Sequence, residues 1–194
     1  MAQRTASVTI TAAILAALLA AVACVPDAAR RDADLAAIAR WQDRRLAPRD
    51  SLTALLASAD AHVRLAAVRA AGLIGRNDIV DELLATLGDA SPSVCGEACF
   101  ALGILGDTLA VPALEAVSRA GKPALRLAAL RGLAQVPNRG AALLDAAATG
   151  DPEAAAAAWD GLRNQVDNVP RDALLPALQA GLTAAEPEVL WQVL

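Results

Sequence analysis

Few side chains in this 194-residue sequence have the chemistry for metal binding or catalysis. Cys95 and Cys99 lie four residues apart, so on a helix they would share one face and could offer two ligands to a soft metal. The single histidine is His62. Zinc usually takes four ligands, mostly Cys or His, and this set is too small. We therefore predict no metal site and expect both thiols to be buried, as small core residues.

No combination of residues matches a catalytic motif. Asp60 and His62 could form a base, but no Ser or Cys nucleophile is placed near them by a motif, and a histidine at a helix start is usually solvated. Residues 103–106 (GILG) end a helix rather than cradle a phosphate, because no strand precedes them. Other carboxylates fit solvated faces: Glu153, Asp160, Glu186 and Glu188. We expect no catalytic residue and no cofactor, so the chain is not predicted to be an enzyme.

The composition predicts an all-α protein. Hydrophobic residues make up 56% of the chain, but aromatic residues only 2%. Ala and Leu, which dominate the sequence, have the highest helix propensities, and the residues that strands prefer are scarce. The formal net charge is −4. A general nucleic-acid binder would show a basic excess and stacking rings, so we expect no nucleic-acid partner.

The N-terminal segment has the pattern of an export signal. Arg4 gives a positive start, an apolar run extends from Ile10 to Val22, and small residues precede Cys24. The run is shorter than the roughly 20 apolar residues that a membrane-spanning helix needs. The segment therefore predicts export of the protein.

This segment resembles the signal of bacterial lipoproteins, in which the Cys after the cleavage site is acylated. Ala21 stands where that family usually has Leu. The resemblance implies a signal peptide at 1–23, a lipid on Cys24 that anchors the chain to a membrane, and a short linker at 24–32. Val25 replaces the Asp that retains many such proteins in the inner membrane, which implies the outer membrane, facing the periplasm. An ordinary signal or an uncleaved anchor is the alternative.

The rest of the chain repeats with a period near 31 residues. Residues 63–69 (VRLAAVR) return as 125–131 (LRLAALR), and 71–75 (AGLIG) return as 102–106 (LGILG). Prolines that precede apolar runs keep the same phase: Pro92, Pro123, Pro152 and Pro187. Proline is tolerated at a first helical position because its missing N–H has no partner there. The period predicts stacked structural repeats.

Each period divides into two short helices. The expected first helices are 78–88, 109–120, 139–149 and 171–183. The expected second helices are 62–74, 93–105, 124–136 and 153–165. We expect 51–58 to pair with 62–74, 33–46 to form an extra N-terminal helix, and Ser91 and Asp151 to be N-caps. One helix pair cannot bury its apolar face alone, so the pairs must stack, and Ala and Gly allow close approach.

The pattern resembles the HEAT-repeat family, in its short bacterial form related to phycobilin lyases. The resemblance covers about residues 50–194 and rests on Leu83-Leu84, Asp89, Val94, Ala98, Gly103 and Gly106-Asp107. It implies an α-solenoid (an α-α superhelix) of about five HEAT-like helical hairpins within 33–194. An unrelated helical bundle is the alternative.

Members of this family often join their repeats by a ladder of Asp–Arg pairs. In this sequence Arg64 and Arg126 keep the Arg and Asp89 keeps the Asp, but no repeat keeps both. Cys95 stands where the middle repeat would have its Arg. We therefore expect apolar stacking, and not the ladder, to stabilise the array.

The resemblance implies a scaffold that binds other proteins. Second helices line the concave surface of HEAT-like stacks, which would present four arginines in register to an acidic partner: Arg64, Arg69, Arg126 and Arg131. The alternative is that they flank the core stripe and cover neighbouring Ala residues with their aliphatic stems. Trp191 lies at the other candidate contact, the end of the stack. The sequence does not identify the partner protein.

The sequence stops in an apolar run, 189–194, where another second helix would begin. This predicts that the array continues in a longer parent protein. One alternative function is therefore the repeat region of a larger lipoprotein with a catalytic domain, such as a cyclophilin-type prolyl isomerase. A weaker alternative is chromophore handling as in phycobilin lyases, against which the scarcity of aromatic residues argues.

Overall fold

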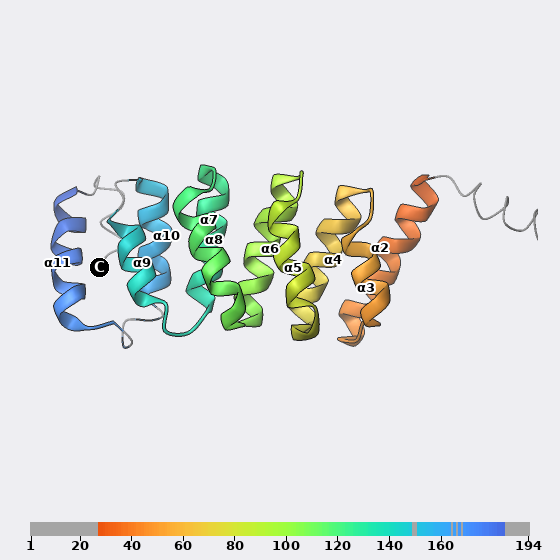
Figure 1. The fold of residues 1–194 in the computed structure, drawn as a ribbon, viewed down its shortest axis with the longest axis horizontal. Helices are drawn as coiled ribbons and strands as arrows, with labels where there is room; N and C mark the ends of the chain where they lie inside the picture. The colour runs from red at the N-terminus through yellow and green to blue at the C-terminus, as the bar shows by residue number, and fades with distance from the viewer. Residues whose placement is uncertain (1–26, 149–150, 164, 166, 168, 185–194) are drawn as a thin grey trace, which may run out of the picture.

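The computed structural model describes residues 27–148, 151–163, 165, 167 and 169–184. These residues form α-helices stacked in one row, from α2 (Asp27–Arg44) at one end to α11 (Arg171–Ala184) at the other (Figure 1). No strand occurs in the described part of the chain. The fold is an all-α solenoid, which confirms the predicted class.

Helical hairpins repeat along the row. Their first helices are α3 (Arg49–Leu56), α5 (Val80–Ala85), α7 (Val111–Ala120) and α9 (Gly140–Ala147). Their second helices are α4 (Ala61–Ile74), α6 (Pro92–Leu105), α8 (Pro123–Gln135) and α10 (Pro152–Arg163). Short 3-10 turns extend two of the first helices: η1 (Asn77–Ile79), η2 (Thr86–Gly88) and η3 (Thr108–Ala110). The second helices therefore agree with the predicted ranges to within two residues at each end.

The N-terminal helix α2 begins earlier than the sequence analysis expected. The described part of α2 includes residues 27–32, so the expectation of a linker through residue 32 is wrong. The reason is local: Ala28 and Ala29 have high helix propensity, and an aspartate in the first turn interacts favourably with the helix dipole. Ile38 of α2 is buried, and Trp41 packs against the core.

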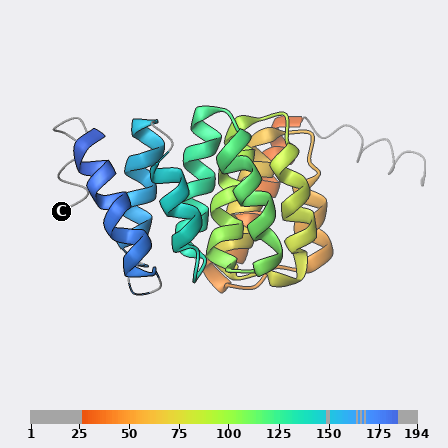
Figure 2. The ribbon, with the colours of Figure 1, turned by 60° about the vertical axis from the view of Figure 1, so that its left-hand side comes forward.

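The second helices form a continuous layer in which each packs against the next, α4 on α6, α6 on α8 and α8 on α10. Figure 2, with the α11 end turned toward the viewer, shows α11 beside the hairpin of α9 and α10. Leucines fill the space between this layer and the first helices, and their side chains are fully buried: Leu52, Leu83, Leu102, Leu114, Leu130, Leu133 and Leu143. The core is thus mostly aliphatic, with the aromatic ring of Trp159 buried near its C-terminal end.

Glycines on the second helices let these helices approach closely. A Cβ on Gly72 would lie 2.9 Å from Cα of Ala101, and a Cβ on Gly161 would lie 2.7 Å from Cβ of Ala134. Between α6 and α8 the contact is closer still, because a Cβ on Gly103 would overlap the backbone of Gly132. Real Cβ atoms do not approach other atoms so closely, so these positions admit only glycine in the present packing.

The helix ends follow the expected signals, with one exception. Pro92, Pro123 and Pro152 each occupy the first helical position. The carboxylate of Asp151 accepts hydrogen bonds from the backbone N–H groups of Glu153 and Ala154, at 3.2 and 3.4 Å, so it caps α10 as expected. The Ser91 hydroxyl makes no capping hydrogen bond to α6. Ser91 contributes its carbonyl, which accepts from the N–H groups of the first turn.

A buried amide joins the end of α10 to the preceding hairpin. Gln165 is 5% exposed. Its side-chain nitrogen donates to the carbonyl oxygens of Ala134 and Val136, at 2.8 and 3.0 Å, and its oxygen accepts from the N–H of Arg139 at 2.8 Å. Because buried polar groups must be paired, this glutamine fixes the loop between α8 and α9.

Candidate functional site

An arginine and an aspartate from successive repeats form a two-fold hydrogen-bonded ion pair. Nε of Arg64 lies 2.7 Å from Oδ2 of Asp89, and Nη2 lies 2.8 Å from Oδ1. Nη1 of Arg64 donates to the carbonyl oxygen of Ser58 at 2.8 Å. The two side chains are 16% and 9% exposed, and the hydrogen bonds from Arg64 hold the pKa of Asp89 below its usual value. The Arg64 guanidinium is therefore engaged within the molecule.

A second Arg–Asp pair, held by a single hydrogen bond, joins α8 to the start of α10. Nη2 of Arg126 lies 2.5 Å from Oδ2 of Asp151. Both pairs connect residues separated by 25 positions, so the Arg of one repeat meets the Asp that precedes the next second helix. We call each pair a rung. The expectation that the ladder would not stabilise the array is wrong. It assumed that both partners would belong to one repeat, but they come from successive repeats.

The rung between α6 and α8 is missing. Cys95 occupies the position of Arg64 and Arg126, and its Sγ donates to the carbonyl oxygen of Asp89 at 3.1 Å. Ala120, three residues before Pro123, stands where Asp89 precedes Pro92 by the same spacing. Cys95 thus replaces the ladder arginine, as the sequence predicted.

Both described cysteines are buried and free, which confirms the expectation for them. Cys95 is 5% exposed and Cys99 is fully buried. Burial raises the pKa of Cys95 and raises that of Cys99 to about 11, so both thiols carry their protons at neutral pH. Within the described residues, no group of three or more His, Cys, Asp or Glu side chains is arranged to hold a metal ion.

His62 is exposed at the start of α4. The Asp60 carboxylate accepts a hydrogen bond of 2.7 Å from the backbone N–H of His62. Asp60 therefore acts as the N-cap of the helix, and this contact does not pair it with the imidazole as a base.

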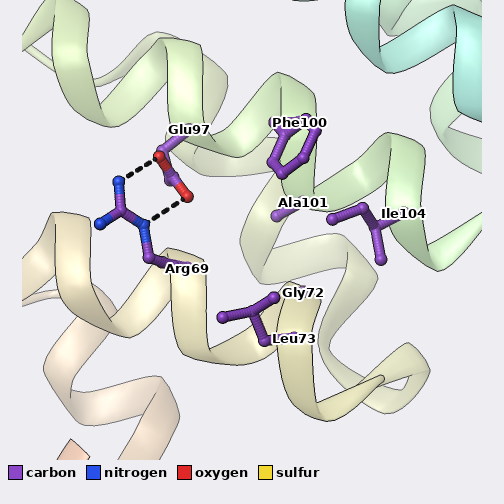
Figure 3. Close-up of a pocket in the computed structure, with 7 residues that line it drawn as sticks. All are labelled: Arg69, Gly72, Leu73, Glu97, Phe100, Ala101 and Ile104. Atoms are coloured by element: carbon purple, nitrogen blue, oxygen red, sulfur yellow. Dashed lines mark hydrogen bonds and ion pairs between the residues drawn. The ribbon is translucent and has the colours of Figure 1, made fainter. Parts of the chain in front are cut away.

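The exposed sides of the second helices carry a small apolar hollow between α4 and α6 (Figure 3). Leu73, Phe100 and Ile104 line it and are 52%, 42% and 40% exposed. Arg69 and Glu97 lie at one side, joined by two hydrogen bonds of 2.9 and 3.0 Å. The hollow has a volume of about 120 Å³. It is an apolar site flanked by a paired, internally neutral group.

A wider and more polar hollow, of about 490 Å³, lies between the next two second helices, α8 and α10. Arg131 is exposed within it, and no ion pair or hydrogen bond joins its side chain to another described residue. Asp160 is paired with Arg163 at 2.5 Å. We call this the charged hollow; its lining residues are Leu127, Arg131, Glu153, Ala156, Ala157, Asp160 and Arg163.

The four arginines predicted to meet a partner thus divide into two groups. Arg69 and Arg131 lie on the exposed side of the second helices, whereas Arg64 and Arg126 form the rungs. Sequence reasoning missed Phe100, although it lies 31 positions from both Arg69 and Arg131 and so shares their register. Cys24 and Trp191 lie outside the described residues.

Part of this stack of helices matches a known protein family. Residues 49–134, from α3 to within one residue of the end of α8, match the family of HEAT repeats. The match supports a HEAT-repeat protein. HEAT repeats commonly serve as scaffolds for protein interactions and are typically not catalytic. The matched HEAT segment contains the whole apolar hollow, the first rung and Arg131. A search of curated proteins found no match to the chain.

Within the described residues, no helix combines the length and the apolar character needed to cross a membrane.

Proposed function

We propose that this protein is an envelope-anchored scaffold that binds other proteins through the exposed side of its second helices. The observation that carries the proposal is the exposure of large apolar side chains beside arginine on that side: Leu73, Phe100 and Ile104 with Arg69 and Arg131. Aromatic residues and arginine are enriched where proteins bind one another. The HEAT-repeat match supports this use of the surface.

The N-terminal sequence supports the membrane anchor in this proposal. The apolar run from Ile10 to Val22 and the small residues before Cys24 support acylation of that cysteine. Val25 supports placement in the outer membrane, facing the periplasm. Metabolic labelling with a palmitate analogue tests this directly. We expect Cys24→Ser to abolish the label, and labelling that survives the substitution would contradict the anchor.

Crosslinking in cells tests the binding surface. We expect the proteins crosslinked to the wild type to be lost with Phe100→Ser and with Arg131→Glu. The matched controls are Leu109→Ser and Arg119→Glu, which change side chains that are 68% and 69% exposed on η3 and α7. Circular dichroism melting of each variant checks that it is folded. If the same proteins are crosslinked to both the Phe100→Ser and the Arg131→Glu variants, the second helices are not the contact surface.

A further inference from the structure

We propose that the end of the row formed by α10 and α11 binds residues 187–194 of this chain, and that this packing adds Trp191 to the exposed side of the second helices. Residues 187–194 lie outside the described part of the chain. The packing is independent of the proposed function. The role of Trp191 rests on that function, because Trp191 would join the surface that binds other proteins.

The helix α11 has no second helix of its own among the described residues. In the preceding hairpins α7 packs against α8 and α9 packs against α10, but the main contact of α11 is with α9. Figure 1 shows α11 at the end of the row. Leu175 on this helix is 59% exposed. Because a repeat buries its apolar side chains only against its neighbours, part of the apolar surface of α11 is left uncovered.

A repeat within the sequence identifies a side chain that a second helix would cover. Residues 175–184 (LPALQAGLTA) repeat residues 111–120 (VPALEAVSRA), so Leu178 is equivalent to Leu114. Leu114 is fully buried, and its Cδ2 would lie 3.6 Å from a Cβ on Gly132 of α8. Leu178 is only partly buried. The side chain that packs under α8 in one hairpin is thus left partly open on α11.

The same alignment extends into residues 187–194 (PEVLWQVL), which match residues 123–130 (PALRLAAL) at the start of α8. Pro187 follows the last residue of α11 by three positions, as Pro123 follows the last residue of α7. The last two residues of the segment are apolar and match positions that are fully buried on α8: Val193 matches Ala129, and Leu194 matches Leu130. A helix in this register would place apolar side chains over Leu178.

The aromatic residue of the segment falls on the exposed side of the layer. Trp191 matches Leu127, which lines the charged hollow between α8 and α10. On α10 the equivalent residue is Ala156, a small residue that lines the same hollow. An indole beside Ala156 would extend the exposed side of the second helices by one helix. Because Trp is enriched among the residues that contribute most to protein binding, Trp191 would be a contact for the partner protein.

The register of the layer gives a distance that tests this packing. The close glycine contacts fall at equivalent positions at each step from α4 to α10, so the register is constant. Between α6 and α8, a Cβ on Gly96 would lie 3.7 Å from Cβ of Ala128. A disulfide requires a Cβ–Cβ separation of about 3.5–4.5 Å. Counted from the proline that starts each helix, the equivalent residues at the proposed contact are Ala156 and Gln192.

Disulfide formation in the purified full chain tests the packing. We expect Ala156→Cys with Gln192→Cys, in a Cys24→Ser background, to form an intramolecular disulfide in most molecules under mild oxidation. Cys95 and Cys99 are buried and carry raised pKa values, so they compete little. Peptide mapping by mass spectrometry identifies the bond.

The matched control is Ala156→Cys with Val193→Cys, in the same background. Successive residues of a helix point about 100° apart, so in the proposed register Val193 faces the core and this pair should stay reduced. Absence of the disulfide between positions 156 and 192, or equal yields in the two pairs, would overturn the packing.

Crosslinking in cells tests the role of Trp191. We expect Trp191→Ser to lose the proteins that Phe100→Ser loses, with an unchanged circular dichroism melting temperature because the indole lies on the exposed side. If the disulfide forms but the crosslinks survive Trp191→Ser, the role of Trp191 is wrong. If the disulfide is absent while the crosslinks still depend on Phe100, the packing is wrong and the scaffold function stands. Crosslinks that depend on neither Phe100 nor Arg131 would contradict the scaffold surface, and with it the role of Trp191.

Discussion

The contacts between successive second helices differ along the row. Where α4 meets α6 and where α8 meets α10, a rung joins the repeats and glycine faces alanine. Where α6 meets α8, the rung is missing and Gly103 faces Gly132. The central contact, which lacks an ion pair, thus brings the two backbones closest. This difference indicates that the array can hold neighbouring repeats in register either by an ion pair at the helix starts or by close backbone packing.

The largest expected effect comes from filling the central contact. A Cβ on Gly132 would overlap the carbonyl oxygen of Cys99, and backbone cannot move aside cheaply. We expect Gly132→Ala to lower the free energy of unfolding by about 3 kcal/mol, since overpacking outweighs the gain of about 1 kcal/mol in helix propensity. Urea denaturation followed by circular dichroism measures this change.

Gly96→Ala is the matched control on α6. A Cβ there would lie 3.7 Å from Cβ of Ala128, an ordinary contact. This variant should be neutral or more stable by up to about 1 kcal/mol. Equal losses in the two variants would contradict the importance of close packing at Gly132.

Removing a rung should have the next largest effect. Arg64→Ala leaves the partly buried Asp89 carboxylate without its guanidinium partner. We expect a loss of about 2 kcal/mol, between the values for exposed and buried pairs. Arg69→Ala removes a pair whose arginine is 55% exposed and should cost less than about 1 kcal/mol. If the two variants unfold at the same urea concentration, the rung is not a stabilising element.

The missing rung can be built to sharpen the comparison. Cys95→Arg alone should destabilise the protein, because it places a guanidinium at a buried position while Ala120 stands where the partner aspartate would be. Adding Ala120→Asp supplies the partner at the position equivalent to Asp89. A double-mutant cycle should give a favourable coupling of about 1.5 kcal/mol, typical of hydrogen bonds between charged groups. A coupling of zero would mean that close approach at Gly103 and Gly132 leaves no room for a rung.

The smallest expected effect is a dependence on pH. The hydrogen bonds from Arg64 hold the pKa of Asp89 below its usual value, so the charged carboxylate stabilises the fold at neutral pH and this stabilisation is lost as the pH falls through the lowered pKa. At pH 6 we expect Asp89→Asn to cost about 1 kcal/mol. Below about pH 4, the usual value for an aspartate, this difference should shrink.

Urea denaturation at pH 6, 4 and 2.5 measures the difference. Asp145→Asn, at an exposed position on α9, is the control and should differ little from the wild type at every pH. A difference for Asp89→Asn that stays constant down to pH 2.5 would contradict the charge contribution of the rung.

The helix pattern was predictable from the sequence because the same signals recur in every repeat. Prolines at first helical positions and apolar residues at helical spacing depend only on local geometry, so the second helices were correctly bounded. The start of α2 was missed because it lies outside the period. The close approach of helices was expected in kind, but the exceptional contact of Gly103 with Gly132 depends on how the helices pack.

The candidate site was only partly predictable. Equal spacings from Arg64 to Asp89 and from Arg126 to Asp151 were present in the sequence, but a pair between repeats is evident only when the stack is assembled. The pairing of Arg69 with Glu97 does not recur, so no periodic signal identifies it. Phe100 shared the register of the exposed arginines, and that register was the available sign of its exposure.

The position of the two rungs bears on how such a chain can change its length. Both partners of each rung lie outside residues 90–120, so this whole stretch is one cassette bounded by complete pairs. Its loss would leave Arg64 with Asp89 and Arg126 with Asp151, and would bring α4 to α8 with Gly72 in the register of Gly103. Duplication of the cassette would lengthen the row in the same way. The central repeat is thus a stretch whose gain or loss would leave both rungs complete.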